Sequence, residues 1–342
     1  MSAFTFDFLW YIVVITALIF YAVLDGFDLG VGCLHLFARN DNERRIFLNA
    51  IGPVWDGNEV WLVIVGGALF AGFPEAFATI FSSFYVFSML LLFGLIFRAV
   101  SIEFRSKHGS KRWRKNWDIA FCCASVLIAF GTGLVLGNLI EGIPLDAHKD
   151  FIGNFLGFIR PYPILFGITT VTLFSMHGSI YLVMKTEGSL HQHLKQWVSK
   201  CIKTFIVCYF LLTLATFYFA PYMTARMREH PSLFLIPLAA VLIIFNIPRQ
   251  MKKENNGWAF ISSCLSILGL LSLFSIGTFP TLVRSSINPE NYSLVISNSA
   301  SSQMTLKILL TIVLIGIPLV LAYGTYVYRV FRGKVKLDDH SY

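Results

Sequence analysis

The stretch FLWYIVVITALIFYAVLDGFDLGVGCLHLF, residues 8–37, is a long apolar run that carries only two acids, Asp25 and Asp28. As a helix it is long enough to cross the roughly 30 Å of hydrocarbon in a membrane. The sequence contains further apolar segments of this kind at residues 48–73, 76–103, 117–140, 158–184, 201–222, 232–248, 258–283 and 304–330. These runs predict a single polytopic membrane domain over residues 1–342, an all-α fold with nine transmembrane helices.

The composition excludes an ordinary soluble protein. Of the 342 residues, 56% are hydrophobic and only 13% are charged. The net charge of +8 could suggest a nucleic-acid partner, but the basic residues fall in short clusters between the apolar runs. We therefore interpret them as loops that set the membrane topology, and expect no nucleic acid to bind.

Basic residues are unequally divided between the two sides of the predicted membrane domain. The odd-numbered segments are followed by loops, or the C-terminal tail, with 19 Lys and Arg, whereas the other loops carry five. The first set comprises Arg39, Arg44, Arg45, Arg105, Lys107, Lys111, Arg112, Arg114, Lys115, Lys185, Lys195, Lys200, Arg249, Lys252, Lys253, Arg329, Arg332, Lys334 and Lys336. The second set comprises Lys149, Arg160, Arg226, Arg228 and Arg284.

This asymmetry predicts the orientation of the chain. Cytoplasmic loops are rich in Lys and Arg, and the first residues, MSAFTFD, carry none. We expect a periplasmic N-terminus and a cytoplasmic C-terminus. We also expect the first four helices and the next four to form two four-helix bundles, with the ninth helix peripheral.

Two neighbouring predicted helices carry acids at similar depths. Asp25 and Asp28 share one helix face, and Asp28 lies about 14 Å from the predicted cytoplasmic end of segment 8–37. The stretch GPVWDGNEVWL, residues 52–62, places Asp56 about 14 Å from the same surface and Glu59 about one turn deeper. Because the two helices run in opposite directions, the four acids are expected to lie together.

Acids at this depth need a physical reason, because each costs several kcal/mol in lipid. One interpretation is a charge-paired polar plug, with Arg98, about 9 Å inside, as the cation. The other is a proton path from the cytoplasm, and both can hold together. Asn58 can add an interhelical hydrogen bond, and small residues allow close helix approach. These small residues are Gly26, Gly30, Gly32, Gly57, Gly66 and Gly67.

The histidines argue against a haem in this chain. Of the eight, only His177 lies well inside a predicted helix. The others lie near helix ends, in loops or in the tail: His35, His108, His148, His191, His193, His230 and His340. One deep histidine cannot supply a pair of axial ligands, so we expect His177 to be a hydrogen-bonded core residue. No metal, nucleotide or redox-cofactor motif is visible in the sequence.

The motifs DGFDLGVG, RNDNERR, GPVWDGNEVWL, HGSIYLVMKTEG and the C-terminal SSQMTLKILL together resemble subunit II of the cytochrome bd-type quinol oxidases, over essentially the whole chain. The resemblance implies a bacterial inner-membrane terminal oxidase that oxidises quinol and reduces dioxygen to water. It implies two b-type haems and one d-type haem, all in subunit I. Subunit II then binds no haem, forms an obligate heterodimer with subunit I within the lipid, and in some members holds a structural quinone or meets small single-helix subunits.

The resemblance also implies residue roles. Asp56 would contribute to a cytoplasmic proton path. Glu59 is a second candidate for this path, although some members of the family carry Gln at its position. Asp25, Asp28 and Arg98 would stabilise the haem region. Three further residues are expected to be structural polar groups: Trp55, Asn58 and His177.

Two rival interpretations stay open. A proton-coupled secondary transporter would also carry acids, glycines and an arginine at the midplane, but such proteins usually contain inverted repeats, and no clear repeat is visible here. A purely structural scaffold would use the same charged residues to hold helices together.

Overall fold

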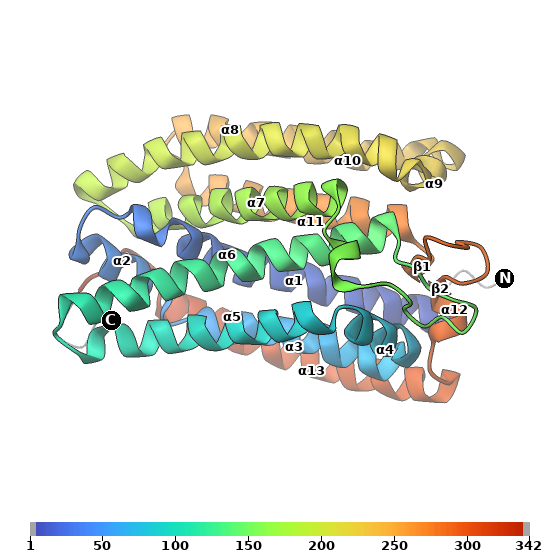
Figure 1. The fold of residues 1–342 in the computed structure, drawn as a ribbon. Helices are drawn as coiled ribbons and strands as arrows, with labels where there is room; N and C mark the ends of the chain where they lie inside the picture. The colour runs from blue at the N-terminus through green and yellow to red at the C-terminus, as the bar shows by residue number, and fades with distance from the viewer. Residues whose placement is uncertain (1–4, 338–342) are drawn as a thin grey trace.

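The computed structural model describes residues 5–337 as a bundle of long helices lying side by side (Figure 1). Residues 1–4 and His340 lie outside the described residues. The long helices are α1 (Phe6–Leu34), α3 (Trp55–Gly72), α5 (Tyr85–Phe104), α6 (Lys111–Glu141), α7 (Pro161–Lys185), α8 (Gly188–Phe219), α10 (Leu235–Lys252), α11 (Asn256–Thr278) and α13 (Gln303–Val330). The shorter ones are α2 (Asp41–Ile51), α4 (Pro74–Ser83), α9 (Ala225–Glu229) and α12 (Ile296–Ser299).

Short elements lie between the helices. Five 3₁₀ turns cover His35–Phe37, Arg105–Lys107, Phe155–Phe158, Pro221–Thr224 and Pro231–Phe234. Strands β1 (Thr281–Val283) and β2 (Leu294–Val295) pair antiparallel at one end of the bundle. Ser301, just beyond α12, donates its backbone N–H to the Gly72 carbonyl over 2.9 Å. The polar stretch between α11 and α13 therefore packs against the end of α3.

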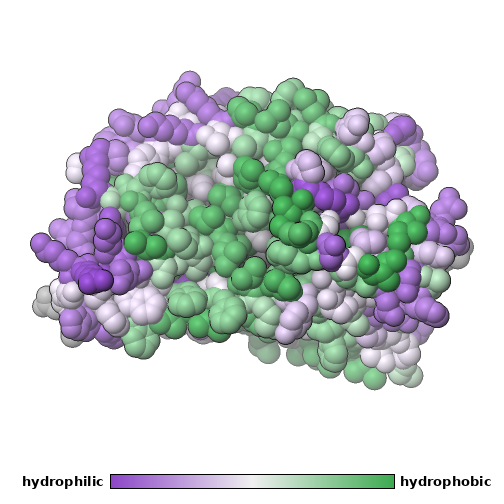
Figure 2. Space-filling view, in the orientation of Figure 1, coloured by the Kyte–Doolittle hydropathy of each residue, from purple (hydrophilic) through white to green (hydrophobic). Residues whose placement is uncertain are grey.

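The number of membrane-crossing helices agrees with the sequence. Within residues 5–337, eight helices are long and apolar enough to cross a membrane, or nine if α2 and α3 form one bent span. α1 begins at the right-hand end of the bundle and α13 ends at the left-hand end (Figure 1). The space-filling view shows apolar residues across the middle of this face and hydrophilic residues at its two ends (Figure 2). This distribution is typical of a protein that spans a bilayer.

The prediction that 48–73 is one continuous helix is wrong. α2 ends at Ile51, α3 begins at Trp55, and their axes differ by 52°. Pro53 lies in the break and lacks the N–H that a continuing helix needs. The depth of Asp56 therefore cannot be counted along one straight helix, as the sequence argument assumed.

Other predicted boundaries also shift. Segment 76–103 is interrupted at Phe84, whose buried ring packs on Phe158 with 4.5 Å between centroids. Segment 258–283 ends as a helix at Thr278, because Pro280 follows and residues 281–283 form β1. Segment 201–222 begins earlier, at Gly188, since polar residues extend α8 beyond its apolar part.

α1 lies at the centre of the bundle and contacts α3, α6, α7 and α11. Its closest approach is to α7, where a Cβ on Gly30 would overlap the backbone of Phe174 and lie 2.9 Å from the Gly178 nitrogen. Gly57, Gly66 and Gly67 on α3 differ, because a Cβ there would meet nothing within 4 Å in the described residues. The prediction of close helix approach is confirmed on α1 and is wrong for α3 within this chain.

α13 is the most exposed of the long helices. Its contacts are mainly with α1 and α3, and Leu306 is its only buried residue. It runs along the edge of the bundle beside α3 (Figure 1). A long apolar helix with one buried residue needs lipid or another chain against its free face.

We predict that Gly30→Ala destabilises the assembled protein by about 1–3 kcal/mol, because the new methyl group overlaps the α7 backbone. Thermal unfolding of the purified complex measures the effect. Gly131→Ala on α6 is the control: a Cβ there meets nothing within 4 Å, and stability should stay the same or rise slightly. Equal stability of the two variants would contradict the close packing of α1 and α7.

Candidate functional site

The centre of the site is an ion pair between Asp25 on α1 and Arg98 on α5. Both side chains are 0% exposed. Arg98 Nη1 donates to Asp25 Oδ2 over 2.8 Å, and Nη2 donates to Oδ1, so the pair is bidentate. Two parallel charge-assisted hydrogen bonds are the strongest way to satisfy a guanidinium away from water. The predicted cationic role of Arg98 thus has a definite partner.

Glu59 lies between this ion pair and the surface of the chain. Its Oε2 is 3.9 Å from Arg98 Nη2, and its side chain is 21% exposed. The contact is longer than a hydrogen bond, so Glu59 adds electrostatic attraction without fixed geometry. Glu59 therefore connects the buried pair to the outer face of α3.

Asp28 is held by a different partner. It is fully buried, and Asn58 Nδ2 donates to its Oδ2 over 2.7 Å. This is the interhelical hydrogen bond expected of Asn58. The Asn58 Oδ1 in turn accepts from the hydroxyl of Tyr328 on α13 over 2.9 Å. The other carboxylate oxygen, Asp28 Oδ1, has no hydrogen-bond partner within residues 5–337.

Tyr328 was missed by the sequence analysis. It lies near the end of an apolar helix, where nothing in the local pattern marks it. The available signal is chemical: a tyrosine hydroxyl on a membrane helix usually needs a hydrogen-bond partner. Which polar group it would meet depends on the packing of α13 against α3.

Asp56 does not join the buried cluster. It is exposed on the first turn of α3 and forms no hydrogen bond or ion pair within residues 5–337. The side chains further along the same outer face are apolar, with Val60 47% and Val63 71% exposed. The expected group of four acids is therefore divided: Asp25, Asp28 and Glu59 lie around Arg98, and Asp56 points out of the chain.

His177 is fully buried, and Trp55 packs against the apolar core. His177 Nδ1 is 2.7 Å from Ser263 Oγ, Nε2 is 2.9 Å from the Val23 carbonyl, and the ring stacks on Phe260. Both ring nitrogens are therefore occupied. Trp55 is half-buried against the apolar core between α2 and α7. Within residues 5–337 no group of three or more His, Cys, Asp and Glu could hold a metal.

A second polar cluster, around Asp118 of α6, was also missed. Asp118 is 1% exposed; its Oδ1 lies 2.6 Å from both His35 Nε2 and Arg105 Nε, and its Oδ2 is 3.2 Å from Arg44 Nη1. Arg105 extends the cluster to Asp41 on α2 over 2.7 Å. From the sequence, Arg44 and Arg105 were expected in loops that set the membrane topology. In the structure they tie α2, α5 and α6 to the end of α1.

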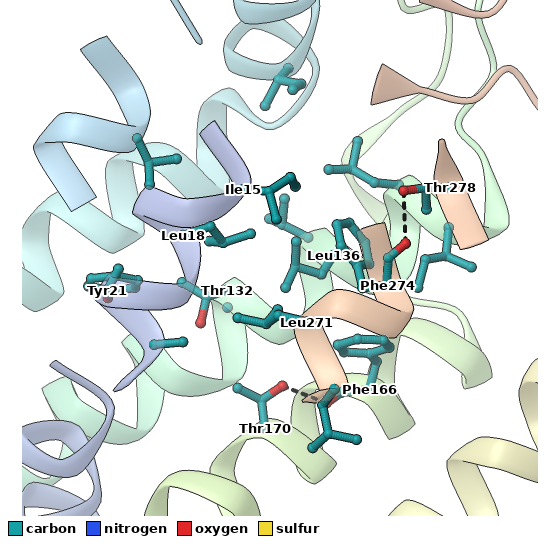
Figure 3. A pocket seen from close by; sticks show the side chains of 18 of the residues that line it. Ile15, Leu18, Tyr21, Thr132, Leu136, Phe166, Thr170, Leu271, Phe274 and Thr278 are labelled. Atoms are coloured by element: carbon teal, nitrogen blue, oxygen red, sulfur yellow. Dashed lines mark hydrogen bonds between the residues drawn. The ribbon is translucent and has the colours of Figure 1, made fainter. Parts of the chain in front are cut away.

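A large apolar cavity of about 1050 Å³ opens beside the acid cluster, between α1, α5, α6, α7 and α11. Its lining includes Ile15, Leu18, Leu136 and Leu271, with a few hydroxyls between them (Figure 3). Thr170 and Thr278 donate to carbonyls of their own helices. The Tyr21 hydroxyl makes no hydrogen bond within the described residues. Because its lining is almost wholly apolar, the cavity can receive a long apolar molecule.

The chain is similar to known proteins along almost its full length. The family model described as cytochrome bd terminal oxidase subunit II matches residues 6–331. Cytochrome bd-I ubiquinol oxidase subunit 2 of Escherichia coli (strain K12) is 32% identical, over 97% of this chain and 96% of the relative. Cytochrome bd ubiquinol oxidase subunit 2 of Bacillus subtilis (strain 168) is 31% identical, over 96% of both chains.

A solved structure shares the fold. A chain of the bd oxidase from Geobacillus thermodenitrificans superimposes with a TM-score of 0.79 at 16% identity, covering 96% of this chain and 99% of that chain.

We predict that Arg98→Ala costs about 3–5 kcal/mol, because the Asp25 carboxylate is left buried without its cation. The double variant Asp25→Asn with Arg98→Met should recover much of this loss, since it removes both charges. Thermal unfolding of the complex and its yield from membranes measure both effects. A double variant as unstable as Arg98→Ala would show that the ion pair is not what holds α1 to α5.

We also predict that Asp118→Asn destabilises the protein by about 1.5–3 kcal/mol, since His35, Arg44 and Arg105 all lose a charged partner. Glu75→Gln is the control, because the Glu75 side chain is 60% exposed and exposed ion pairs such as Glu75–Lys149 contribute about 0–1 kcal/mol. Chemical or thermal unfolding compares the two. Equal losses would mean that the buried cluster contributes no more than a surface pair.

Proposed function

The chain belongs to the cytochrome bd terminal oxidase subunit II family, and we propose that it acts as the haem-free subunit, which supports the haem-bearing subunit I and helps to bring it protons from the cytoplasm. As a member of this family it is a subunit of a quinol:oxygen oxidoreductase. It is a multi-pass protein of the bacterial inner membrane.

The outward position of Asp56 is the observation that supports this proposal best. A carboxylate on the outer face of a membrane helix, followed by exposed valines, costs several kcal/mol if lipid covers it. A partner chain with polar groups or water would remove that cost. Gly57 and Gly67 leave the same helix open to close approach by another helix. We therefore place subunit I against α3, with Asp56 at the interface.

The proposed proton path enters from the cytoplasm and uses Asp56 where the two subunits meet. Glu59, one turn further along α3, is a second candidate, because it lies between the outer face and the buried pair. A carboxyl group at such an interface can take up a proton from one side and release it on the other.

Asp25, Asp28 and Arg98 have a supporting role in this proposal. Their contacts hold α1, α3 and α5 together directly behind the face that would meet subunit I. A rigid face of this kind would stabilise the haem region of the partner. In this proposal three further residues stabilise the packing of the same helices as structural polar groups: Trp55, Asn58 and His177.

The haems of the complex, two b-type and one d-type, are proposed to lie in subunit I. His177 does not fit an axial ligand, because both ring nitrogens already have hydrogen-bond partners. The apolar lining of the cavity would suit the long apolar tail of a structural quinone. Such a quinone would add apolar packing and take no part in the reaction. Quinol as substrate would bind to subunit I.

The fold is proposed to be inserted with its N-terminus periplasmic and its C-terminus cytoplasmic. Two four-helix bundles would be α1, α3, α5 and α6, and α7, α8, α10 and α11, with α13 peripheral. The main contacts within each group run between α1 and α3, α5 and α6, α7 and α8, and α10 and α11, and the two groups are joined where α7 packs on α6 and α1. Small single-helix subunits would meet remaining exposed apolar faces.

The transporter alternative has no support among the relatives, which are oxidase subunits. The scaffold alternative is favoured by one observation, the buried bidentate Asp25–Arg98 pair. It predicts that the acids matter only for assembly.

Asp56→Asn separates the two functions. If Asp56 relays protons, we expect quinol oxidase turnover of the complex to fall by about 10²-fold or more with all haems retained, because the amide cannot take up and release a proton. Oxygen consumption and the haem absorption spectrum are measured on one preparation.

Glu75→Gln, in the first turn of α4, is the control, as an exposed acid away from the site. It should leave turnover unchanged. Loss of haem in Asp56→Asn, in step with turnover, would support the scaffold and contradict the relay.

A further inference from the structure

The peripheral helix α13 is fastened to the bundle at its C-terminal end. The Val335 N–H donates to the Lys185 carbonyl over 2.9 Å, and Lys185 Nζ donates to the Phe331 carbonyl over 2.7 Å. Lys334 Nζ adds a bond to the Met184 carbonyl over 2.9 Å. These contacts join the end of α13 to the last turn of α7, although the middle of α13 is nearly all exposed.

One side chain from this fastened end reaches into the acid cluster. Tyr328 is half-buried, and its hydroxyl donates to Asn58 Oδ1 over 2.9 Å. Asn58 is 3% exposed and donates from Nδ2 to Asp28 over 2.7 Å. Three helices, α13, α3 and α1, are thereby connected by a continuous hydrogen-bonded chain that ends on a fully buried carboxylate.

We propose that Tyr328 is a positioning residue, which holds the Asn58 amide with its NH₂ group toward Asp28 and so sets the hydrogen bonding of that buried acid. The inference rests on the proposed function, because Asp28 belongs to the cluster assigned to the haem-bearing face.

The orientation of the Asn58 amide determines what it offers to Asp28. An asparagine side chain offers a donor on one side and an acceptor on the other, and it can turn over to exchange them. The Tyr328 hydroxyl gives the amide oxygen a donor, so the NH₂ group is directed to the carboxylate. Without the hydroxyl, the amide can present its oxygen to Asp28 instead, which pairs only with a protonated carboxyl. The residue at position 328 therefore determines whether the Asn58 amide hydrogen-bonds to the ionised or to the protonated form of Asp28.

Other ionisable groups surround the same acid and stay in place when the hydroxyl is removed. Asp25 on α1, Glu59 on α3 and Arg98 on α5 act electrostatically on Asp28. Asp28 in turn acts on Tyr181 of α7 and on Tyr328, and Cys264 of α11 is a further neighbour of Tyr328. Substitution of Tyr328 by Phe leaves all of these charges unchanged, so its effect reports the hydrogen bond.

The test is Tyr328→Phe in the intact complex, with Tyr326→Phe as control. Tyr326 is on the same helix, is 66% exposed and makes no hydrogen bond within the described residues. Infrared difference spectra of the resting protein between two pH values identify Asp28 as the carboxyl signal that Asp28→Asn removes. This readout does not depend on turnover.

In Tyr328→Phe we expect the Asp28 signal to change position, and the pH at which it titrates to move by on the order of one unit. The haem content should equal that of the parent complex, and the control should match the parent in every measurement. An Asp28 signal unchanged in position and in titration would overturn the inference.

Incorporation of a ring-fluorinated tyrosine at position 328 covers the case in which Tyr328→Phe does not assemble. It keeps the shape of the side chain and makes the hydroxyl a stronger donor, so the Asp28 signal must still move. The result is separate from that for Asp56→Asn: turnover unaffected in Asp56→Asn removes the proton path, whereas an unmoved Asp28 signal removes only the role of Tyr328.

Discussion

A buried guanidinium in a membrane protein constrains everything packed around it. Arg98 is 0% exposed, and a cation at that depth needs a carboxylate partner to offset the loss of water. Asp25 is that partner and accepts two hydrogen bonds, and Glu59 adds charge from α3. Because the three residues come from three helices, the interactions of the Arg98 guanidinium with Asp25 and Glu59 constrain how α1, α3 and α5 pack against each other.

The first turns of α3 divide their polar residues between two environments. Asn58 faces inward to Asp28, and Asp56, two residues earlier, faces outward. Residues two apart on a helix cannot share a face, so one motif serves the interior and the exterior at once. The bend at Gly52–Val54 makes this possible, since it starts α3 in a new direction after α2. The polar residues of GPVWDGNEVWL therefore lie in two environments, one within the chain and one at its surface.

Hydropathy predicted the long helices well, because spanning the bilayer dominates the sequence there. The pairing of Arg98 with an acid was equally accessible, since a cation at that depth requires one. Three features could not be predicted from the sequence. They are the break before Trp55, the buried contacts of Asp118 with Arg105 and His35, and the outward orientation of Asp56. Arg105 was placed in a loop because it belongs to a basic run, and a run of charges does not reveal which member turns inward. Tyr328 could not be connected to Asn58 without knowing that α13 packs on α3.

The position of α13 has a consequence for how the cluster meets its surroundings. A helix with one buried residue is held by few apolar contacts, so its polar contacts at residues 328–335 carry much of the attachment. Anything that presses on the exposed face of α13, whether lipid or a partner chain, acts on the helix that carries Tyr328. The Asn58 amide joins that helix to Asp28 through two hydrogen bonds, and the strength of a hydrogen bond depends steeply on its angle and distance. The exposed helix α13 and the fully buried Asp28 are thus joined by hydrogen bonds through two side chains, Tyr328 and Asn58.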